Sequence, residues 1–225
     1  MSSGSELAVT ELAADVVARM PNGRRYVLGI AGPPAAGKST LSQNLAAAVR
    51  TEHAVSAEIA PMDGFHKTSA ELDAVGARHR KGQSDTFDVA GFVERLKLLR
   101  EAPLGQRVPW PIYDRGLHDP VPDAITFAAQ RLAVVEGNYL LLDQPGWSEV
   151  RAQLDEVWYL DAEDHVIEQR LTDRHLLGGK TIEQAKAKIT DSDMPNARLI
   201  ADTRGHADAV LRENGGRYIV IRADR

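Results

Sequence analysis

The stretch at residues 26–40, YVLGIAGPPAAGKST, most constrains what this chain can fold into. An apolar run leads into a turn bounded by Gly32 and Gly37, and Lys38-Ser39 follow directly, so GxxxxGK[ST] is matched at every fixed position. Such a loop surrounds phosphate groups with backbone N–H groups, and glycine permits the close approach and positive φ angles that this needs. The stretch therefore predicts a strand, a phosphate-binding loop and a helix. An ordinary glycine-rich turn is the alternative.

Each part of this loop has a predicted role. Lys38 is placed to reach the β- and γ-phosphates of a nucleotide, and the hydroxyl of Ser39 is placed to ligate Mg²⁺. The helix that begins near Gly37 directs its N-terminal amides toward the negative charge. The predicted nucleotide-binding residues are Gly32, Pro33, Pro34, Ala35, Ala36, Gly37, Lys38, Ser39 and Thr40.

Length and composition exclude several classes of protein. A chain of 225 residues suits a single α/β domain. The net charge of −5, without a dense basic block, argues against a nucleic-acid partner. The absence of cysteine excludes disulfides and thiolate zinc sites. No apolar run reaches the roughly 18 residues of a membrane span, and the N-terminus lacks the features of a secretion signal. We therefore expect a cytoplasmic protein without a membrane partner.

Strand-like and helix-like segments alternate along the chain, which predicts parallel βαβ units. We predict a P-loop NTPase three-layer fold, with a five-stranded, mainly parallel sheet and helices on both faces. The whole chain, 1–225, forms one domain, with an N-terminal helix within 1–21 and a small lid at about 170–182. The apolar run before the loop is one predicted strand. The other four occupy 57–62, 132–135, 157–160 and 218–221. The predicted helices occupy 5–20, the segment after the loop, the segment after Asp88, 162–177 and the segment from 181.

Two details of this prediction concern helix caps and a proline-rich segment. Ser3 and Glu6 have the spacing of a capping box for the first helix, and Asp88 is a suitable N-cap for the helix after it. Five prolines between residues 103 and 122 exclude a long helix. A short hairpin or an ordered loop is expected there.

Three predicted strands end in acidic residues, Asp63, Glu136 and Asp161. Ligands of open parallel sheets bind beyond the carboxyl ends of the strands. We therefore expect Asp63 to accept a proton from an attacking hydroxyl group, and Asp63 and Glu136 to hold Mg²⁺ directly or through water. Alternatively, Asp63 belongs to a simple turn and Glu136 is a solvated carboxylate. Asp161 is interpreted as the cap of the following helix.

Arg170 and Arg174 lie four residues apart and share one face of a predicted helix. A flexible break, GGK at 178–180, follows them. Mobile arginines that close over a transferred phosphoryl group stabilise the charge on its equatorial oxygens. The pair is therefore predicted to belong to a lid, with a solvated helix face as the alternative.

These segments together resemble the uridine kinase, phosphoribulokinase and bacterial pantothenate kinase superfamily of P-loop kinases. Within it, the chain looks most like the bacterial nucleoside/nucleotide kinase-like branch, some of whose members are labelled kinases of fructose transport systems. The resemblance covers roughly 26–210. The motifs that carry it are DGFH at 63–66, SDTFD at 84–88, YDRGLHDP at 113–120, VVEGNYLL at 134–141 and RLTDR at 170–174.

The resemblance implies a role for each matching residue. Asp63 matches the catalytic aspartate, Glu136 the acid of the Mg²⁺ shell, and Arg170 and Arg174 the lid arginines that act on the phosphates together with Lys38. The predicted metal residues are Ser39, Asp63 and Glu136. The predicted acceptor-binding residues are Asp63, His66, Asp85, Tyr113, Arg115 and His118.

Two departures from the uridine kinase pattern concern the acceptor. Uridine kinases carry Ser-Phe-Tyr after the catalytic aspartate, whereas this chain carries Gly64-Phe65-His66. The later arginine pair of their lid is Gly179-Lys180 here. The acceptor therefore need not be uridine.

The sequence predicts an ATP- and Mg²⁺-dependent kinase that transfers the γ-phosphoryl group to an alcohol. A sugar, a nucleoside or a pantothenate-like alcohol would all fit. The alternative is a nucleotide-binding regulatory module associated with sugar uptake, without turnover. A GTPase is disfavoured because the base-reading motif Asn-Lys-x-Asp is absent. The oligomeric state is left open, a homodimer included.

Overall fold

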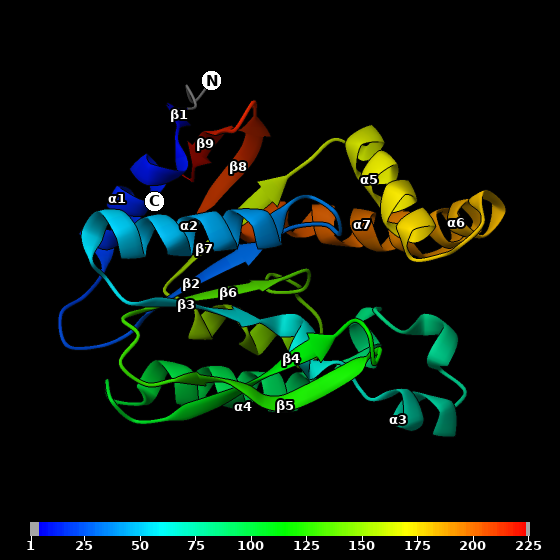
Figure 1. Cartoon of the computed structure of the whole chain (residues 1–225), viewed down its shortest axis with the longest axis horizontal. Coiled ribbons are helices and arrows are strands. Elements are labelled where there is room, and N and C mark those ends of the chain that lie inside the picture. The colour runs from blue at the N-terminus through cyan, green and yellow to red at the C-terminus, as the bar shows by residue number, and fades with distance from the viewer. Residues whose placement is uncertain (1–4, 224–225) are drawn as a thin grey trace.

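The computed structural model describes residues 5–223 of the chain (Figure 1). Its main sheet has seven strands in the order β1-β9-β8-β7-β2-β6-β3. The five strands from β8 to β3 are parallel, and β9 and β1 join their edge in antiparallel pairing. The strands are β1 (Ser5–Leu7), β2 (Tyr26–Ala31), β3 (Ala57–Pro61), β6 (Leu132–Gly137), β7 (Glu156–Asp161), β8 (Ala209–Asn214) and β9 (Arg217–Arg222). The predicted three-layer α/β fold is confirmed.

The predicted number of five strands is wrong, because β1 and β8 were not foreseen. Only the first half of β8 is apolar and covered, so it carries a weak strand pattern. The strand predicted at 218–221 is β9, which returns antiparallel from β8. Segment 5–7, predicted as helix, instead pairs with 218–220 as β1.

The first helix, α1 (Val9–Arg19), consequently starts later than predicted. Glu6 lies in β1, and Ser3 of the predicted capping box lies outside the described residues. The carboxylate of Glu11 instead accepts a hydrogen bond of 2.7 Å from the backbone N–H of Ala8. Pairing with a distant strand has overridden the local helical pattern.

Helices cover both faces of the sheet (Figure 1). Side chains alternate along β2 between the two faces of the sheet. Leu28 and Ile30 pack under α1 and α2. Val27 and Ala31 face α4 and the proline-rich segment on the other side. The N-cap of α4 is Asp88, as predicted, and its carboxylate accepts from the N–H of Gly91 at 3.0 Å. The remaining helices are α2 (Lys38–His53), α3 (Ser69–Ala74), α4 (Val89–Glu101), α5 (Asp164–Leu177), α6 (Ile182–Lys188) and α7 (Met194–Ala201).

The proline-rich segment forms an antiparallel hairpin, β4 (Val108–Asp114) with β5 (Asp119–Phe127). It packs beside α4 rather than joining the main sheet.

A buried arginine, Arg25, connects the start of β2 to α4 and to the segment after β5. The guanidinium of Arg25, just before β2, donates to the carbonyls of Leu99 (2.6 Å), Ala128 (2.9 Å) and Gln130 (3.0 Å).

Helices α5 and α6 project beyond the carboxyl ends of the parallel strands (Figure 1). A π-helical turn, Ile189–Asp193, joins α6 to α7, and α5, this turn and α7 share a small apolar cluster of their own. The prediction that Asp161 caps α5 is wrong, because the N-cap of α5 is Glu163. The carboxylate of Asp161 accepts instead from Arg212 (2.7 Å), on neighbouring β8, and from Arg204 (3.2 Å).

No helix among residues 5–223 combines the length and apolar character that crossing a bilayer would need.

Candidate active site

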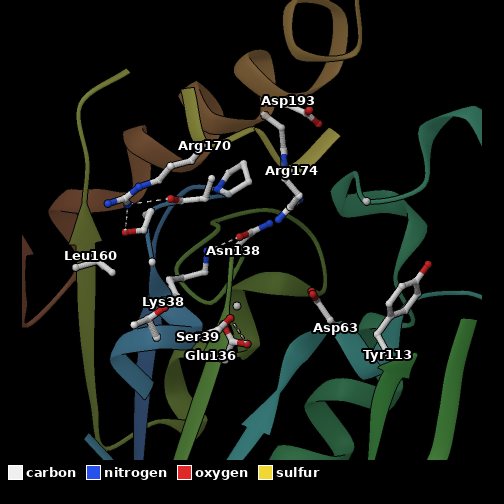
Figure 2. A pocket seen from close by; sticks show the side chains of 18 of the residues that line it. Lys38, Ser39, Asp63, Tyr113, Glu136, Asn138, Leu160, Arg170, Arg174 and Asp193 are labelled. Carbon is white, nitrogen blue, oxygen red and sulfur yellow. Dashed lines mark hydrogen bonds between the residues drawn. The ribbon is translucent and has the colours of Figure 1, made fainter. Parts of the chain in front are cut away.

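A cleft of about 870 Å³ lies at the carboxyl ends of the parallel strands, which is the usual size of a small-molecule site. Figure 2 shows Lys38, Ser39 and Glu136 on its floor, with Arg170 and Arg174 reaching down from α5. Asp63 and Tyr113 stand on the opposite side. The predicted site residues that line the cleft are Pro34, Ala35, Ala36, Gly37, Lys38, Ser39, Thr40, Asp63, His66, Tyr113, Arg115, Glu136, Arg170 and Arg174.

The phosphate loop needs its glycines for two different reasons. Gly32 has a φ of +147°, and a Cβ there would stand 2.5 Å from the carbonyl oxygen of Leu160 on β7. Gly37 has a φ of +103° and is the N-cap of α2. Ala35 also has a positive φ, of +62°, a conformation that residues with a Cβ rarely adopt. These positive φ angles set the course of the loop along the cleft.

Lys38 is buried at the first turn of α2. Its ammonium group donates to the carbonyl of Pro33 (2.9 Å) and to Oδ1 of Asn138 (2.7 Å). Burial lowers the pKa of Lys38 to about 8, although the carboxylates of Glu136 and Asp63 oppose this shift.

Ser39 and Glu136 form a pair suited to a magnesium ion. The Ser39 hydroxyl donates to Oε1 of Glu136 at 3.1 Å. Burial raises the pKa of Glu136, and nearby Asp63 raises it further, whereas Lys38 lowers it. Mg²⁺ prefers hard oxygen ligands and commonly takes roughly one or two from the protein, with substrate phosphates and water completing the shell. The hydroxyl and carboxylate present fit such an ion.

Asp63 belongs to a short 3-10 helix, Met62–Phe65, that follows β3. Its neighbour Gly64 packs directly on the hairpin, since a Cβ there would lie 2.2 Å from the carbonyl oxygen of Pro111. One of the two departures from the uridine kinase pattern therefore has a steric reason. The close approach of two backbones leaves room only for glycine.

His66 is held on three sides. Its Nδ1 lies 2.7 Å from the backbone oxygen of Asp63, and its ring packs between those of Phe87 (4.0 Å between centroids) and Tyr113 (4.7 Å). A carbonyl oxygen only accepts, so Nδ1 carries the proton. Burial lowers the pKa of His66, which favours the neutral ring. In that form Nε2 is a hydrogen-bond acceptor.

Asp85 and His118, both predicted to bind the acceptor, do not line the cleft. The carboxylate of Asp85 is exposed and forms an ion pair of 2.6 Å with Arg80. His118 lies exposed in the turn of the hairpin, with a φ of +56°. Lys81, which was not predicted, reaches the cleft instead, and its ammonium group donates to Asp119 (2.8 Å) and to the His118 carbonyl (2.6 Å).

Arg170 and Arg174, the two arginines predicted to belong to a lid, differ in what they contact. The guanidinium of Arg170 donates to the carbonyls of Ala35 and Ala36, both at 3.2 Å, and so joins α5 to the phosphate loop. The guanidinium of Arg174 makes no hydrogen bond or ion pair within the part of the chain that is described. Its charge contributes to the lowered pKa of Lys38, so the two cations lie within electrostatic range of each other. Both arginines thus face the place where phosphates would bind.

Two further parts of the cleft escaped sequence reasoning. Asn138 follows directly on Gly137 at the end of β6, and its polar position after an apolar strand was the available signal. The far end of the cleft is lined by residues from α1, α2 and the β8–β9 hairpin, which no motif marks. These are Val9, Asn44, Glu213, Gly216 and Tyr218.

The model of the phosphoribulokinase/uridine kinase family matches residues 27–217. The chain belongs to this family. This confirms the resemblance seen in the motifs, and it supports ATP-dependent kinase chemistry.

Individual proteins are similar to most of this chain. An uncharacterized Escherichia coli protein, YggC, is 37% identical over 197 residues, which cover 87% of this chain and 81% of YggC. A protein of Schizosaccharomyces pombe named "Putative uridine kinase" is 34% identical over 211 residues, covering 90% of this chain and 89% of its own.

Solved structures show the same fold. One described as a "putative fructose transport system kinase" from Silicibacter sp. TM1040 has a TM-score of 0.83 and 34% identity, covering 92% of this chain and 98% of its own. The YFH7 protein of Saccharomyces cerevisiae, with a TM-score of 0.78 and 20% identity, covers 96% and 99% and shares the fold.

Proposed function

We propose that this protein transfers the γ-phosphoryl group of ATP to a hydroxyl group of a small molecule, with Mg²⁺ as the cofactor. The observation that carries the proposal is the position of Asp63. Its carboxylate acts on the pKa of both Lys38 and Glu136, and it stands between the phosphate loop and the hairpin (Figure 2). A carboxylate there can serve a second substrate that approaches from the hairpin side.

The donor half of the cleft suits a nucleoside triphosphate. The amides of the loop, Lys38 and the lid arginines would hold the phosphates. The far end of the cleft, at Asn44 and Tyr218, has room for the nucleoside. Mg²⁺, held by Ser39 and Glu136, would neutralise charge on the phosphate oxygens.

In the proposed reaction, Asp63 orients the acceptor hydroxyl and accepts its proton while the oxygen bonds to the γ-phosphorus. The bond between the γ-phosphorus and the bridging oxygen breaks, and ADP leaves. Arg170 and Arg174 would balance charge on the transferred group. Closure of the lid would exclude water, which otherwise hydrolyses ATP.

The test is a screen for ADP release over sugars, nucleosides, vitamin alcohols and hydroxy acids, with Asp63→Asn as the comparison. Removal of a general base should lower turnover by about 100-fold or more. ATP binding, measured by calorimetry, should stay within a few-fold, because the loop is untouched. Asp73→Asn makes the same charge change at an exposed residue paired with Arg78, and it should alter neither quantity. Phosphorylation that survives Asp63→Asn would refute the mechanism.

The alternative, a nucleotide-binding regulatory module associated with sugar uptake, predicts a different result. ATP would bind, and no acceptor would release ADP above the Asp63→Asn level.

A further inference from the structure

Arg115 is an exposed arginine in the turn between β4 and β5. It lines the cleft, and no hydrogen bond or ion pair to it exists within residues 5–223. The same cleft is lined by His66 and Glu136. An arginine presents five N–H donors in a planar fork that matches a carboxylate or a phosphate.

The turn that carries Arg115 is ordered by its own hydrogen bonds. Oδ1 of Asp114 accepts from the N–H groups of Gly116 (2.7 Å) and Leu117 (2.9 Å). The opposite side of the turn is tied to Lys81 through the carbonyl of His118. Arg115 is therefore presented from a defined position on the hairpin, next to Tyr113.

The donor does not account for this charge. The phosphate side of the cleft already holds Lys38 and the lid arginines, which approach from α2 and α5. Lys81, the other cation on the hairpin side, is satisfied by Asp119, Ser69 and the carbonyl of His118. Among the described residues that line the hairpin side of the cleft, Arg115 is the cation that remains available for an anion that arrives with the acceptor.

His66 adds a second recognition feature on the same wall. Nδ1 is taken by the Asp63 carbonyl, and no partner for Nε2 exists within the described chain. An unprotonated Nε2 accepts from a hydroxyl group and repels an anion. The hairpin side of the cleft therefore offers Nε2 of His66 as an acceptor for a hydroxyl group and the guanidinium of Arg115 as a donor to an anion.

We propose that the phosphoryl acceptor is a hydroxylated acid, whose carboxylate or phosphate group pairs with Arg115 and one of whose hydroxyls donates to Nε2 of His66. The inference rests on the proposed kinase function and specifies its substrate class.

The experiment compares acceptors that differ only in their charged group. Suitable pairs are glycerate with glycerol, pantothenate with panthenol, and ribose 5-phosphate with ribose, so that carboxylates and phosphates form separate arms. The acid of at least one pair should have the higher kcat/KM. Arg115→Gln should lower kcat/KM for that acid by about 10- to 100-fold, mainly through KM, because a charge-assisted hydrogen bond is lost. The value for the neutral partner should stay unchanged.

Two controls separate recognition from general damage. Arg78→Gln removes an exposed arginine that pairs with Asp73 outside the cleft, and it should leave both members of a pair unaffected. His66→Phe keeps a stacked ring but removes Nε2 together with the Nδ1–H donor to the Asp63 carbonyl, and it should lower kcat/KM for both members by about 10-fold or more. Preference for the neutral partner, or an equal loss for both partners in Arg115→Gln, would overturn the proposal.

A binding measurement keeps the test independent of turnover. Each acid is titrated into the protein loaded with Mg²⁺ and a non-hydrolysable ATP analogue, and into Arg115→Gln loaded in the same way. Binding that weakens in the variant supports the proposal even if no ADP is released, a result that would count against the kinase function alone. If no acid binds the native protein more tightly than the variant, the proposal fails. Turnover of neutral alcohols only would overturn it and leave the kinase function standing.

Discussion

Replacing Gly64 by alanine tests whether the position of the 3-10 helix that carries Asp63 is set by its contact with the β4–β5 hairpin. The added Cβ would stand 2.2 Å from the carbonyl oxygen of Pro111, 2.5 Å from its carbonyl carbon and 2.9 Å from the nitrogen of Ile112. Ordinary contacts begin near 3.4 Å, so the two segments must separate by about 1 Å. All three atoms belong to the backbone of β4 and cannot rotate away as a side chain would.

The expected loss of stability lies at the upper end for overpacked sites, about 3 kcal/mol in the free energy of unfolding. Activity should fall as well, because Asp63 and His66 flank the substituted position and move with it. A displacement of about 1 Å in a catalytic site costs on the order of 100-fold in rate. ATP binding should change little, since the phosphate loop lies on a different strand.

Urea denaturation, followed by tryptophan fluorescence, measures the first effect, and ADP release with an identified acceptor measures the second. Gly205→Ala is the matched control. A Cβ there meets no atom within 4 Å, and its φ is not positive. It should change stability by less than about 0.5 kcal/mol. Equal stability and turnover of the two variants would refute the close approach of 3-10 helix and hairpin.

Two further predictions concern buried cations. Burial lowers the pKa of Lys38 to about 8 in the free protein, from 10.5, so between these values the unfolded chain holds a proton that the folded one has released. Raising the pH from about 7 to about 10 should therefore stabilise the native protein relative to Lys38→Met by up to about 3 kcal/mol, and a constant difference in urea denaturation would contradict this. Arg25→Leu should cost about 3 kcal/mol, because three carbonyls lose a donor in the interior. Arg107→Leu, at an exposed residue, should cost less than about 0.5 kcal/mol in the same assay, and equal costs would show that the Arg25 contacts are dispensable.

The parts of the site that follow from local chemistry were predictable. The phosphate loop is a contiguous motif, because a backbone that closely approaches phosphates requires glycine at positions 32 and 37. Asp63 lies just beyond β3 and Glu136 is the penultimate residue of β6, and parallel strands bring their carboxyl ends to one edge of the sheet. The cap at Asp88 is likewise a contact between near neighbours.

The edge of the sheet could not be predicted in the same way. Segment 5–7 has no strand pattern of its own and becomes β1 only because β9 offers an unpaired edge. Asp161 resembles a helix cap in sequence, but Arg212 on the adjacent strand competes for its carboxylate. Partners distant in sequence decided both outcomes.

The sequence by itself determined that a nucleotide-type phosphate loop, strand-end acids and a proline-rich hairpin occur in this chain. Only the tertiary structure decided which residues of the hairpin reach the cleft. Lys81 binds Asp119 across 38 residues and fixes the turn, which leaves His118 exposed and Arg115 at the site. The physical reason is that a side chain's access to the cleft depends on how the hairpin packs against the segment around Lys81. No local pattern records that packing.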